Sequence, residues 1–304
     1  MRSLHTTRRL VLLAYSMCVA TTPAAARQIA PSSDAWTSVE AALGRKGAVQ
    51  PGGVFKVAFP RGDLQVSVGG VTLKPAFALG GWVAFKDVAN GTAMVMGDLV
   101  LTEDEVAPVM TALQAGGVEQ TALHNHVLGE SPRIMYMHIA GHGAPSAIAR
   151  TIHDALAQSK TPLGPLPLPA APTAAELDTA GITAALGRGG KLNGVVYQVS
   201  IPRAEQITEM GHVVPPSMGV ATAINFQPTG GGKAAITGDL VLRASEVNPV
   251  IRALRAHGIL VSALHSHMLD EEPRLLFMHF WANDDAVTLA RGLRAALDET
   301  KSGK

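Results

Sequence analysis

Stretches of alternating apolar and polar residues in the first half of the chain predict a series of β-strands. The clearest alternation covers Phe55–Phe59, and the short apolar runs Trp82–Phe85 and Ala93–Leu101 are further strand candidates. A short helical stretch, Trp36–Leu43, precedes them. The pattern therefore predicts a sheet that follows an N-terminal helix.

A second helix is predicted to begin at Thr102, because Thr102 and Glu105 have the spacing of a capping box. It should end near Gly116 and Gly117. The second half of the chain has Arg243 at the position of Thr102, so we expect this cap to be lost there. Three more elements follow, namely strands over Thr121–Leu128 and Arg133–Ala140, joined as a hairpin through Gly129–Pro132, and a final helix from Pro145 to Ala157.

The second half of the chain repeats the first. The segment from Gly97 to His138 recurs without a gap 141 residues later, and 23 of its 42 positions are identical. Five prolines between Pro162 and Pro172 mark a stiff linker between the copies. We therefore divide the chain into a leader over residues 1–26, repeat 1 over 35–158, a Pro-rich linker over 159–175 and repeat 2 over 176–301.

The order of elements in each repeat predicts an α+β fold, with helices on one face of a mainly antiparallel sheet. A ferredoxin-like arrangement is the specific form we expect. Two such repeats in one chain should pack as an internal pseudo-dimer.

The first 26 residues have the pattern of a secretory signal peptide. Basic residues precede an apolar run over Leu10–Ala20, and Ala24-Ala25-Ala26 offers a cleavage site of small residues. A buried N-terminal helix is the alternative, but no amphipathic period supports it. We expect a periplasmic or secreted protein without a lipid anchor, because Tyr15 and Met17 do not fit a lipobox around Cys18.

Composition narrows the class of protein further. Cys18 is the only cysteine, so a chain without the leader could form neither disulfides nor thiolate metal sites. Loss of the leader changes the formal net charge from +1 to −2. Charged residues make up only 16% of the chain, which argues against a nucleic-acid partner, and no other segment is apolar enough for a transmembrane helix.

The chemistry of the chain is concentrated in one histidine pattern that both repeats contain. A His-x-His pair is followed twelve residues later by a third histidine, and six of the ten histidines outside the leader belong to these two sets. The sets are His124, His126 and His138 in repeat 1 and His265, His267 and His279 in repeat 2.

Strand geometry suggests that each set converges. Side chains alternate along a strand, so His124 and His126 should share a face. If His124 lies opposite His138 in the hairpin, the third imidazole joins that face with Cβ atoms about 5 Å apart. Three imidazoles at this distance suit a divalent transition metal such as zinc, copper, iron or nickel. Tyr136 and Phe277 should flank the clusters as an aromatic wall. A buried polar cluster without metal is the alternative.

Several charged residues near the histidines are further site candidates. Glu130 and Glu271, in the predicted turns, could be a fourth metal ligand or a catalytic base toward metal-bound water. Arg133 and Arg274 could bind an anionic substrate group, or could form ion pairs with these glutamates. For the carboxylates that follow glycine, Asp98 and Asp239, we expect a turn or cap role rather than metal ligation.

Two resemblances bear on the family. The spacing from Gly117 through His-x-His to Glu130 resembles the first cupin motif, which makes a cupin-like barrel the alternative fold. The combination of Gly-Asp-Leu-Val-Leu, Ala-Leu-His-x-His, Glu-x-Pro-Arg and Met-His resembles an uncharacterised secreted family typified by the mycobacterial lipoproteins LppY and LpqO. This resemblance implies export and a two-copy layout, and it brings no catalytic residues.

These patterns lead to one functional hypothesis and two alternatives. We expect an exported metal-binding protein with one His₃(Glu) site in each repeat. An open coordination position would make it a metal-dependent hydrolase or oxidoreductase, although the sequence identifies no substrate. The main alternative is a non-catalytic module that binds a cell-envelope ligand, a small molecule or a partner. Metal storage or delivery is the third.

Overall fold

The computed structural model describes residues 33–165 and 176–302. The predicted leader with Cys18 and most of the predicted linker lie outside the described residues. Repeat 1 contains α1 (Ser33–Leu43), β1 (Ala48–Gln50), β2 (Val54–Pro60), β3 (Ser67–Val68), β4 (Val71–Thr72), α2 (Pro75–Ala78), β5 (Gly80–Ala89), β6 (Thr92–Thr102), α3 (Glu103–Ala115), β7 (Glu119–His124), β8 (Ile134–Gly143) and α4 (Pro145–Leu156).

Repeat 2 has the same order of elements apart from the short helical segment η1, which replaces α2. It contains α5 (Thr179–Leu186), β9 (Lys191–Asn193), β10 (Val196–Pro202), β11 (Thr208–Glu209), β12 (His212–Val213), η1 (Pro216–Met218), β13 (Ala221–Gly230), β14 (Lys233–Leu242), α6 (Ala244–Ala256), β15 (Leu260–His265), β16 (Leu276–Asp285) and α7 (Ala286–Asp298).

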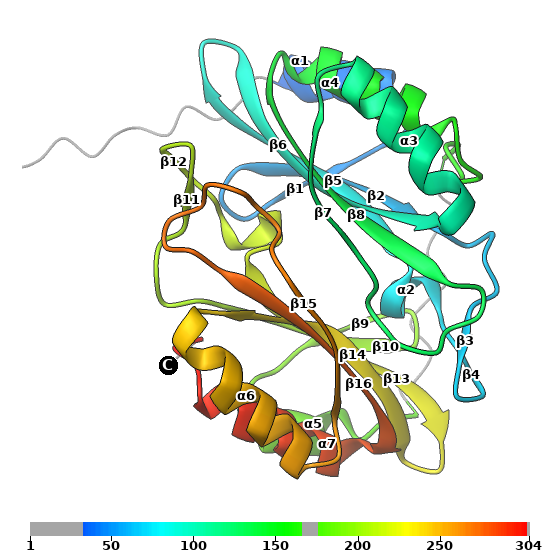
Figure 1. Ribbon diagram of the computed structural model, residues 1–304, viewed down its shortest axis with the longest axis vertical. Coiled ribbons are helices and arrows are strands. Elements are labelled where there is room, and N and C mark those ends of the chain that lie inside the picture. Colours follow the sequence, from blue (N-terminus) through cyan, green and yellow to red (C-terminus); the bar gives the residue numbers. More distant parts are fainter. Residues whose placement is uncertain (1–32, 166–175, 303–304) are drawn as a thin grey trace, which may run out of the picture. The chain divides into compact units, whose positions relative to one another are not determined.

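Each repeat forms one six-stranded sheet whose neighbouring strands are antiparallel. The strand order is β1-β2-β5-β6-β8-β7 in repeat 1 and β9-β10-β13-β14-β16-β15 in repeat 2. Helices α1, α3 and α4 cover one face of the first sheet, and α5, α6 and α7 cover one face of the second (Figure 1). The expected α+β class with two similar repeats is confirmed.

The order of the central strands agrees with the ferredoxin-like arrangement. The chain runs from β6 through α3 to β7 and returns as β8 between them, which is a split β-α-β unit. Strand β5 then lies on the other side of β6, and β2 and β1 extend the sheet. The sheets are open at both edges, so the cupin-like barrel is wrong.

Strand β6 is covered on both faces, by the helices of repeat 1 on one side and by residues of repeat 2 on the other. Residues Ala93–Leu101 are buried at every position, on both faces of the strand. One face packs under the helices, where Leu99 and Leu101 join Val109 and Leu113 of α3. The other face contributes to cores that also contain residues of repeat 2. Ala84, Met94 and Met96 of repeat 1 share one such core with Met218, Val220 and Phe277 of repeat 2. Strands buried on both faces read as continuous apolar runs, as β6 does.

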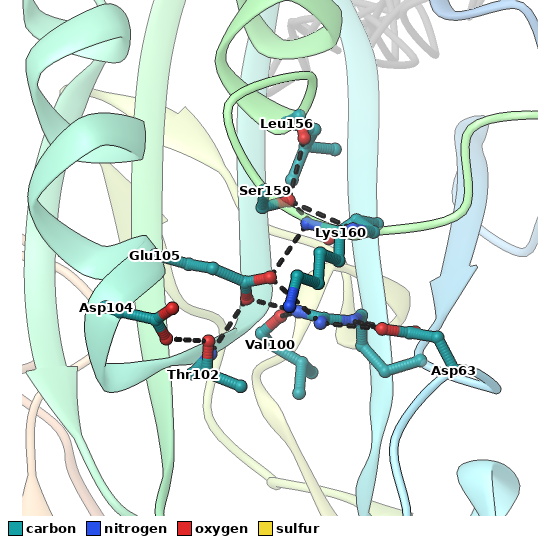
Figure 2. Close-up of polar contacts among 10 residues, drawn as sticks. Asp63, Val100, Thr102, Asp104, Glu105, Leu156, Ser159 and Lys160 are labelled. Carbon is teal, nitrogen blue, oxygen red and sulfur yellow. Dashed lines mark hydrogen bonds and ion pairs between the residues drawn. The ribbon is translucent and has the colours of Figure 1, made fainter.

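The first turn of α3 is fixed by a buried ion pair. Arg61 is fully buried, and its guanidinium donates to both carboxylate oxygens of Glu105 at 2.7 and 3.1 Å. Figure 2 shows Glu105 between Thr102 and Lys160, whose backbone N–H groups donate to it at 2.9 and 2.7 Å. This confirms the glutamate half of the expected capping box.

Repeat 2 builds the same arrangement. Arg203 donates to Glu246 at 2.7 and 3.0 Å, and the Arg243 N–H donates to Glu246 at 2.7 Å. Arginine has no hydrogen-bond acceptor, so Arg243 cannot supply the hydroxyl half of a capping box, whereas the contribution of the glutamate is kept. Among the described residues, no helix is long and apolar enough to span a membrane.

Candidate metal centre

The histidines lie on the hairpins β7–β8 and β15–β16, which form one edge of each sheet. His124 is the last residue of β7, His126 lies in the following loop, and His138 lies in the middle of β8. The expected pairing of His124 with His138 is wrong. His138 pairs with Ala122, and His124 pairs with Tyr136, next to an irregularity between Gln120 and Ala122. Because this shift is two residues, His124 and His138 still project from the same face.

The six imidazoles form one cluster rather than two. The closest imidazole contact of each histidine is with a histidine of the other repeat. Ring centroids are 3.5 Å apart for His124 and His265, 3.9 Å for His126 and His279, and 3.8 Å for His138 and His267. Within repeat 1, by contrast, His124 lies 5.3 Å from His126 and 5.0 Å from His138.

Two groups of three histidines among the described residues have ligand atoms within 4.8 Å of one another. One consists of His124, His265 and His279, and the other of His138, His265 and His267. Both groups combine residues of the two repeats, which differs from the expected single site within each repeat. The histidine clusters could therefore hold a metal ion between the repeats.

The orientation of the rings leaves one nitrogen of each histidine available. In four of them Nδ1 lies within hydrogen-bond distance of a backbone carbonyl, which assigns the proton to Nδ1 and the lone pair to Nε2. The distances are 3.0 Å from His124 to Asn125, 3.1 Å from His265 to Ser266, 3.3 Å from His267 to Gly219 and 2.6 Å from His279 to Gly238.

The Nε2 atoms of all six histidines are buried and have no hydrogen-bond partner. An unpartnered buried polar atom costs about 1–3 kcal/mol, so six together need a compensating partner. A metal ion fits them, because metal-bound histidines commonly donate their other ring N–H to a carbonyl or carboxylate.

Burial also keeps the imidazoles in the form that binds metal. It is the main cause that lowers the pKa of His265 and His279 to about 3, and it holds the pKa of His138 well below the ordinary value. The rings are therefore neutral at neutral pH.

Asp98 and Asp239 belong to the same cluster. Each lies inside a central strand, where Asp98 pairs with His138 and Asp239 pairs with His279. The turn or cap role expected for them is wrong. One oxygen of each carboxylate is buried without a partner. Burial, and then the charge of Asp239, raise the pKa of Asp98 well above its usual value.

The contact between His267 and Asp239 points to a cation. Nε2 of His267 lies 3.0 Å from an oxygen of Asp239, while Nδ1 of the same ring faces the Gly219 carbonyl. With the proton on Nδ1, a lone pair would face a carboxylate oxygen. Two ligand atoms on one ion with bonds of about 2.0–2.1 Å lie about 3.0–3.4 Å apart, which matches this spacing. The equivalent distance from His126 to Asp98 is 3.9 Å.

Aromatic rings close the cluster from both sides, as expected. The ring of Tyr136 stacks on His126 at 3.2 Å, and that of Phe277 stacks on His267 at 3.5 Å between centroids. The Tyr136 hydroxyl donates to the Ala78 carbonyl at 2.8 Å.

The two glutamates hold the hairpin loops. Glu130 accepts from the Ile134 N–H at 3.1 Å, and Glu271 accepts from the Leu275 N–H at 2.9 Å. Neither belongs to the histidine groups. The second oxygen of Glu130 is buried without a partner, and burial raises the pKa of Glu130 to about 7.

The two arginines differ in their partners. Arg274 forms an ion pair with Glu271 at 3.1 Å, which is the alternative considered for it. Arg133 instead lies 3.5 Å from Glu103 on the surface. A catalytic role for the glutamates and substrate binding by the arginines stay predictions.

Lys56 and Trp82 also border the cluster, and the sequence pattern did not single them out. The Lys56 ammonium lies 3.7 Å above the Trp82 ring, and Trp82 pairs with Asp98 across the sheet. Burial lowers the pKa of Lys56 to about 8, although the negative charge of Asp98 acts in the other direction and raises it. Repeat 2 has Gln198 in place of Lys56, so this border is specific to repeat 1.

A family model described as a Domain of Unknown Function (DUF1259) matches the chain twice, over residues 37–158 and 180–299. This confirms the duplicated domain of unknown function, and the resemblance to LppY and LpqO stays a prediction. No curated protein matches the chain.

Two solved structures share distant similarity. EtuB from Clostridium kluyveri is 10% identical, with 83% of this chain and 90% of that chain covered and a TM-score of 0.19. The trimeric bacterial microcompartment shell protein PduB is 13% identical, with the same coverage and a TM-score of 0.20. With TM-scores this low, neither structure supports a conclusion about this chain.

Proposed function

We propose, from the premise that this chain belongs to the DUF1259 family, that it is a metal-binding protein whose ion is held by histidines of both repeats. The observation that carries this proposal is the set of six buried Nε2 atoms without hydrogen-bond partners, beside two aspartates that each have one buried oxygen without a partner. A cluster without metal would leave these atoms unsatisfied together, whereas bound metal would provide a partner for those that ligate it and would offset the carboxylate charge.

The donor set narrows the class of metal. Neutral imidazoles and carboxylates suit zinc, iron, copper and nickel, and the residues that the structure describes include no cysteine, which disfavours soft copper(I). A bound ion with a free coordination position would supply Lewis-acid chemistry, as in metal-dependent hydrolases or oxidoreductases. Glu130 is the candidate base for such chemistry, because its pKa of about 7 suits proton transfer at neutral pH.

Export is part of the same proposal. It rests on the basic start, the apolar run and the Ala24-Ala25-Ala26 site of the leader. Intact mass of the protein from its native host should show loss of the first 26 residues and no lipid on Cys18. A full-length or lipid-modified mass would contradict it.

Metal analysis of untagged protein tests the proposal. We expect the purified protein to contain at least about one equivalent of a transition metal. His265→Ala should lower this content strongly, because His265 belongs to both histidine groups. His153→Ala is the matched control, because His153 lies on α4, its side chain contacts Asp154, and it belongs to neither histidine group.

Two results would contradict the proposal. Wild-type protein that neither contains nor binds transition metal would overturn metal binding, and the non-catalytic module for a cell-envelope ligand or partner would become the better interpretation. A His265→Ala variant that binds as much metal as wild type would overturn the assignment of the ion to these histidines.

A further inference from the structure

We infer that the centre holds two metal ions, and that each ion takes the His-x-His pair of one repeat together with the third histidine of the other. This inference rests on the proposed function. It adds the number of ions and the exchange of one ligand between the repeats.

The number of donors exceeds what one ion can use. Six imidazole nitrogens and two aspartates converge in one cluster, whereas zinc in proteins is almost always bound by four ligands. A single tetrahedral ion would leave at least four of these buried donors without a partner. Two ions can use all eight donors, with four for each.

His265 decides how the donors divide. It belongs to both histidine groups, yet its Nδ1 faces the Ser266 carbonyl, so only Nε2 can bind a metal. One nitrogen lone pair serves one ion. The two groups therefore cannot each hold an ion with all three of their histidines.

The pseudo-symmetry of the chain resolves this conflict. The group of His138, His265 and His267 is one complete set, and Asp239 is its nearby carboxylate, 3.0 Å from His267. Replacing each residue of this set by its counterpart in the other repeat defines a second set. It consists of His124, His126, His279 and Asp98.

Ring distances show that the imidazoles of the two sets are similarly spaced. In the first set the centroids lie 5.1 Å apart for His265 and His267, 3.8 Å for His138 and His267, and 5.7 Å for His138 and His265. In the second set the equivalent distances are 5.3 Å, 3.9 Å and 5.2 Å. The stacked rings of His124 and His265, 3.5 Å apart, lie where the two sets meet.

The second set is the more open of the two. His126 and Asp98 are 3.9 Å apart, whereas His267 and Asp239 are 3.0 Å apart. Asp98 also lies near the positive charge of Lys56, which has no counterpart in repeat 2. We therefore expect the second ion to bind more weakly than the first.

Zinc titration of metal-free, untagged protein counts the ions. We expect two equivalents for wild type, with different affinities. One equivalent would overturn the two-ion inference and leave the proposed function intact. No binding would overturn both.

Two double variants test the ligand exchange. Asparagine replaces histidine, because it is polar and fits in the space of the imidazole, whereas its amide does not reach the position of Nε2. His126→Asn/His279→Asn removes two ligands of the second set, so one equivalent should remain at wild-type affinity. His126→Asn/His138→Asn removes one ligand from each set, so no equivalent should remain at that affinity. At each damaged site, zinc affinity should fall by more than the about 10–100-fold that is typical when a residue hydrogen-bonded to a metal ligand is replaced.

The opposite pattern would overturn the exchange. If each repeat held its own ion, the pair His126 and His138 would leave one site intact, and the pair His126 and His279 would damage both. If one central ion were held by His124, His265 and His279, the pair His126 and His138 would have no effect. Substituted cobalt(II) gives an absorption spectrum that reports the ligands independently of affinity, and circular dichroism confirms that each variant folds.

Discussion

At the scale of single residues, position within the hairpin decides which atoms remain free. His124 and His265 end their strands, and the carbonyl that follows each of them takes up Nδ1. This local contact turns Nε2 toward the cluster in both repeats. The carbonyls thereby fix the tautomer that metal binding needs.

Tyr136 offers a test of whether the aromatic wall is only structural. Its hydroxyl donates to the buried Ala78 carbonyl, and repeat 2 already has Phe277 at the equivalent position. Tyr136→Phe should lower the free energy of unfolding by about 1–2 kcal/mol, because it removes one buried hydrogen bond. Zinc affinity should stay unchanged. Urea unfolding and zinc titration measure the two effects, and a loss of zinc binding would make Tyr136 part of the site.

The sequence identified the histidines but missed the aspartates. A third histidine at the same spacing in both copies is a signal that survives the divergence of the repeats. Asp98 follows a glycine, which favours a turn, and only the extended pairing of β6 shows that it lies inside a strand. The sequence signal for the aspartates was a charged residue at the same position of a continuous apolar run in both repeats, because such runs form strands that are buried on both faces.

At the scale of elements, the repeats use the same joint between sheet and helix. Arg61 with Glu105, and Arg203 with Glu246, tie the start of α3 and of α6 to the neighbouring strand and to the segment after the last helix. Burial raises the pKa of Glu105, but hydrogen bonds from Arg61 and from backbone N–H groups outweigh it and lower the pKa below its usual value.

Replacement of this carboxylate should have a pH-dependent effect. A lowered pKa in the folded state means that ionised Glu105 contributes stability above the unfolded pKa of about 4.3, and that this stability is lost as pH falls. Glu105→Gln should lower the free energy of unfolding by about 1.5–3 kcal/mol at pH 7, because it removes the charge from the buried partner of Arg61, which keeps the more exposed Asp63 as its other charged partner. The difference from wild type should shrink below about pH 4.

Denaturant unfolding across pH measures this difference. Glu103→Gln is the control, since Glu103 is exposed and its contact with Arg133 spans 3.5 Å. It should change stability by less than about 1 kcal/mol. A constant difference between wild type and Glu105→Gln from pH 7 to pH 3 would contradict the role of the ionised carboxylate.

The elements were easier to predict than their register. Alternation and caps located the main helices and strands within a few residues. The His-x-His motif was expected within one strand, but β7 ends at His124, and His126 lies in the loop. Chain periodicity does not contain the irregularity at Gln120, because it depends on how the edge strand meets its neighbour.

At the scale of the whole molecule, the two repeats share their interior. The core around Met218 combines residues of both repeats, and Thr121 of β7 donates to the His267 carbonyl at 2.6 Å. Sequence analysis indicated a pseudo-dimer from the duplication. It could not indicate which histidines would meet, because contacts between two halves leave no periodic trace in either half.

A substitution in this shared core should affect both repeats. Met218 is fully buried, so Met218→Ala should lower the free energy of unfolding by about 2–5 kcal/mol. Trp36 and Trp82 report on repeat 1, and Trp281 reports on repeat 2. In the wild-type background, single-tryptophan versions with the reporter in repeat 1 or in repeat 2 should have the same unfolding midpoint. In the Met218→Ala background, the two midpoints should again coincide, at a lower denaturant concentration. Separate transitions, of which only that of repeat 2 responds, would show that the repeats are independent.

The most direct test of a metal centre shared between the repeats is anomalous diffraction at the zinc edge, from crystals of the untagged protein loaded with zinc. We expect at least one peak in the cluster that lies within about 2.0–2.1 Å of Nε2 atoms from both repeats, with His138, His265 and His267 as the first set. A zinc ion bound only by histidines of one repeat, or zinc elsewhere with none in the cluster, would contradict a metal centre shared between the repeats.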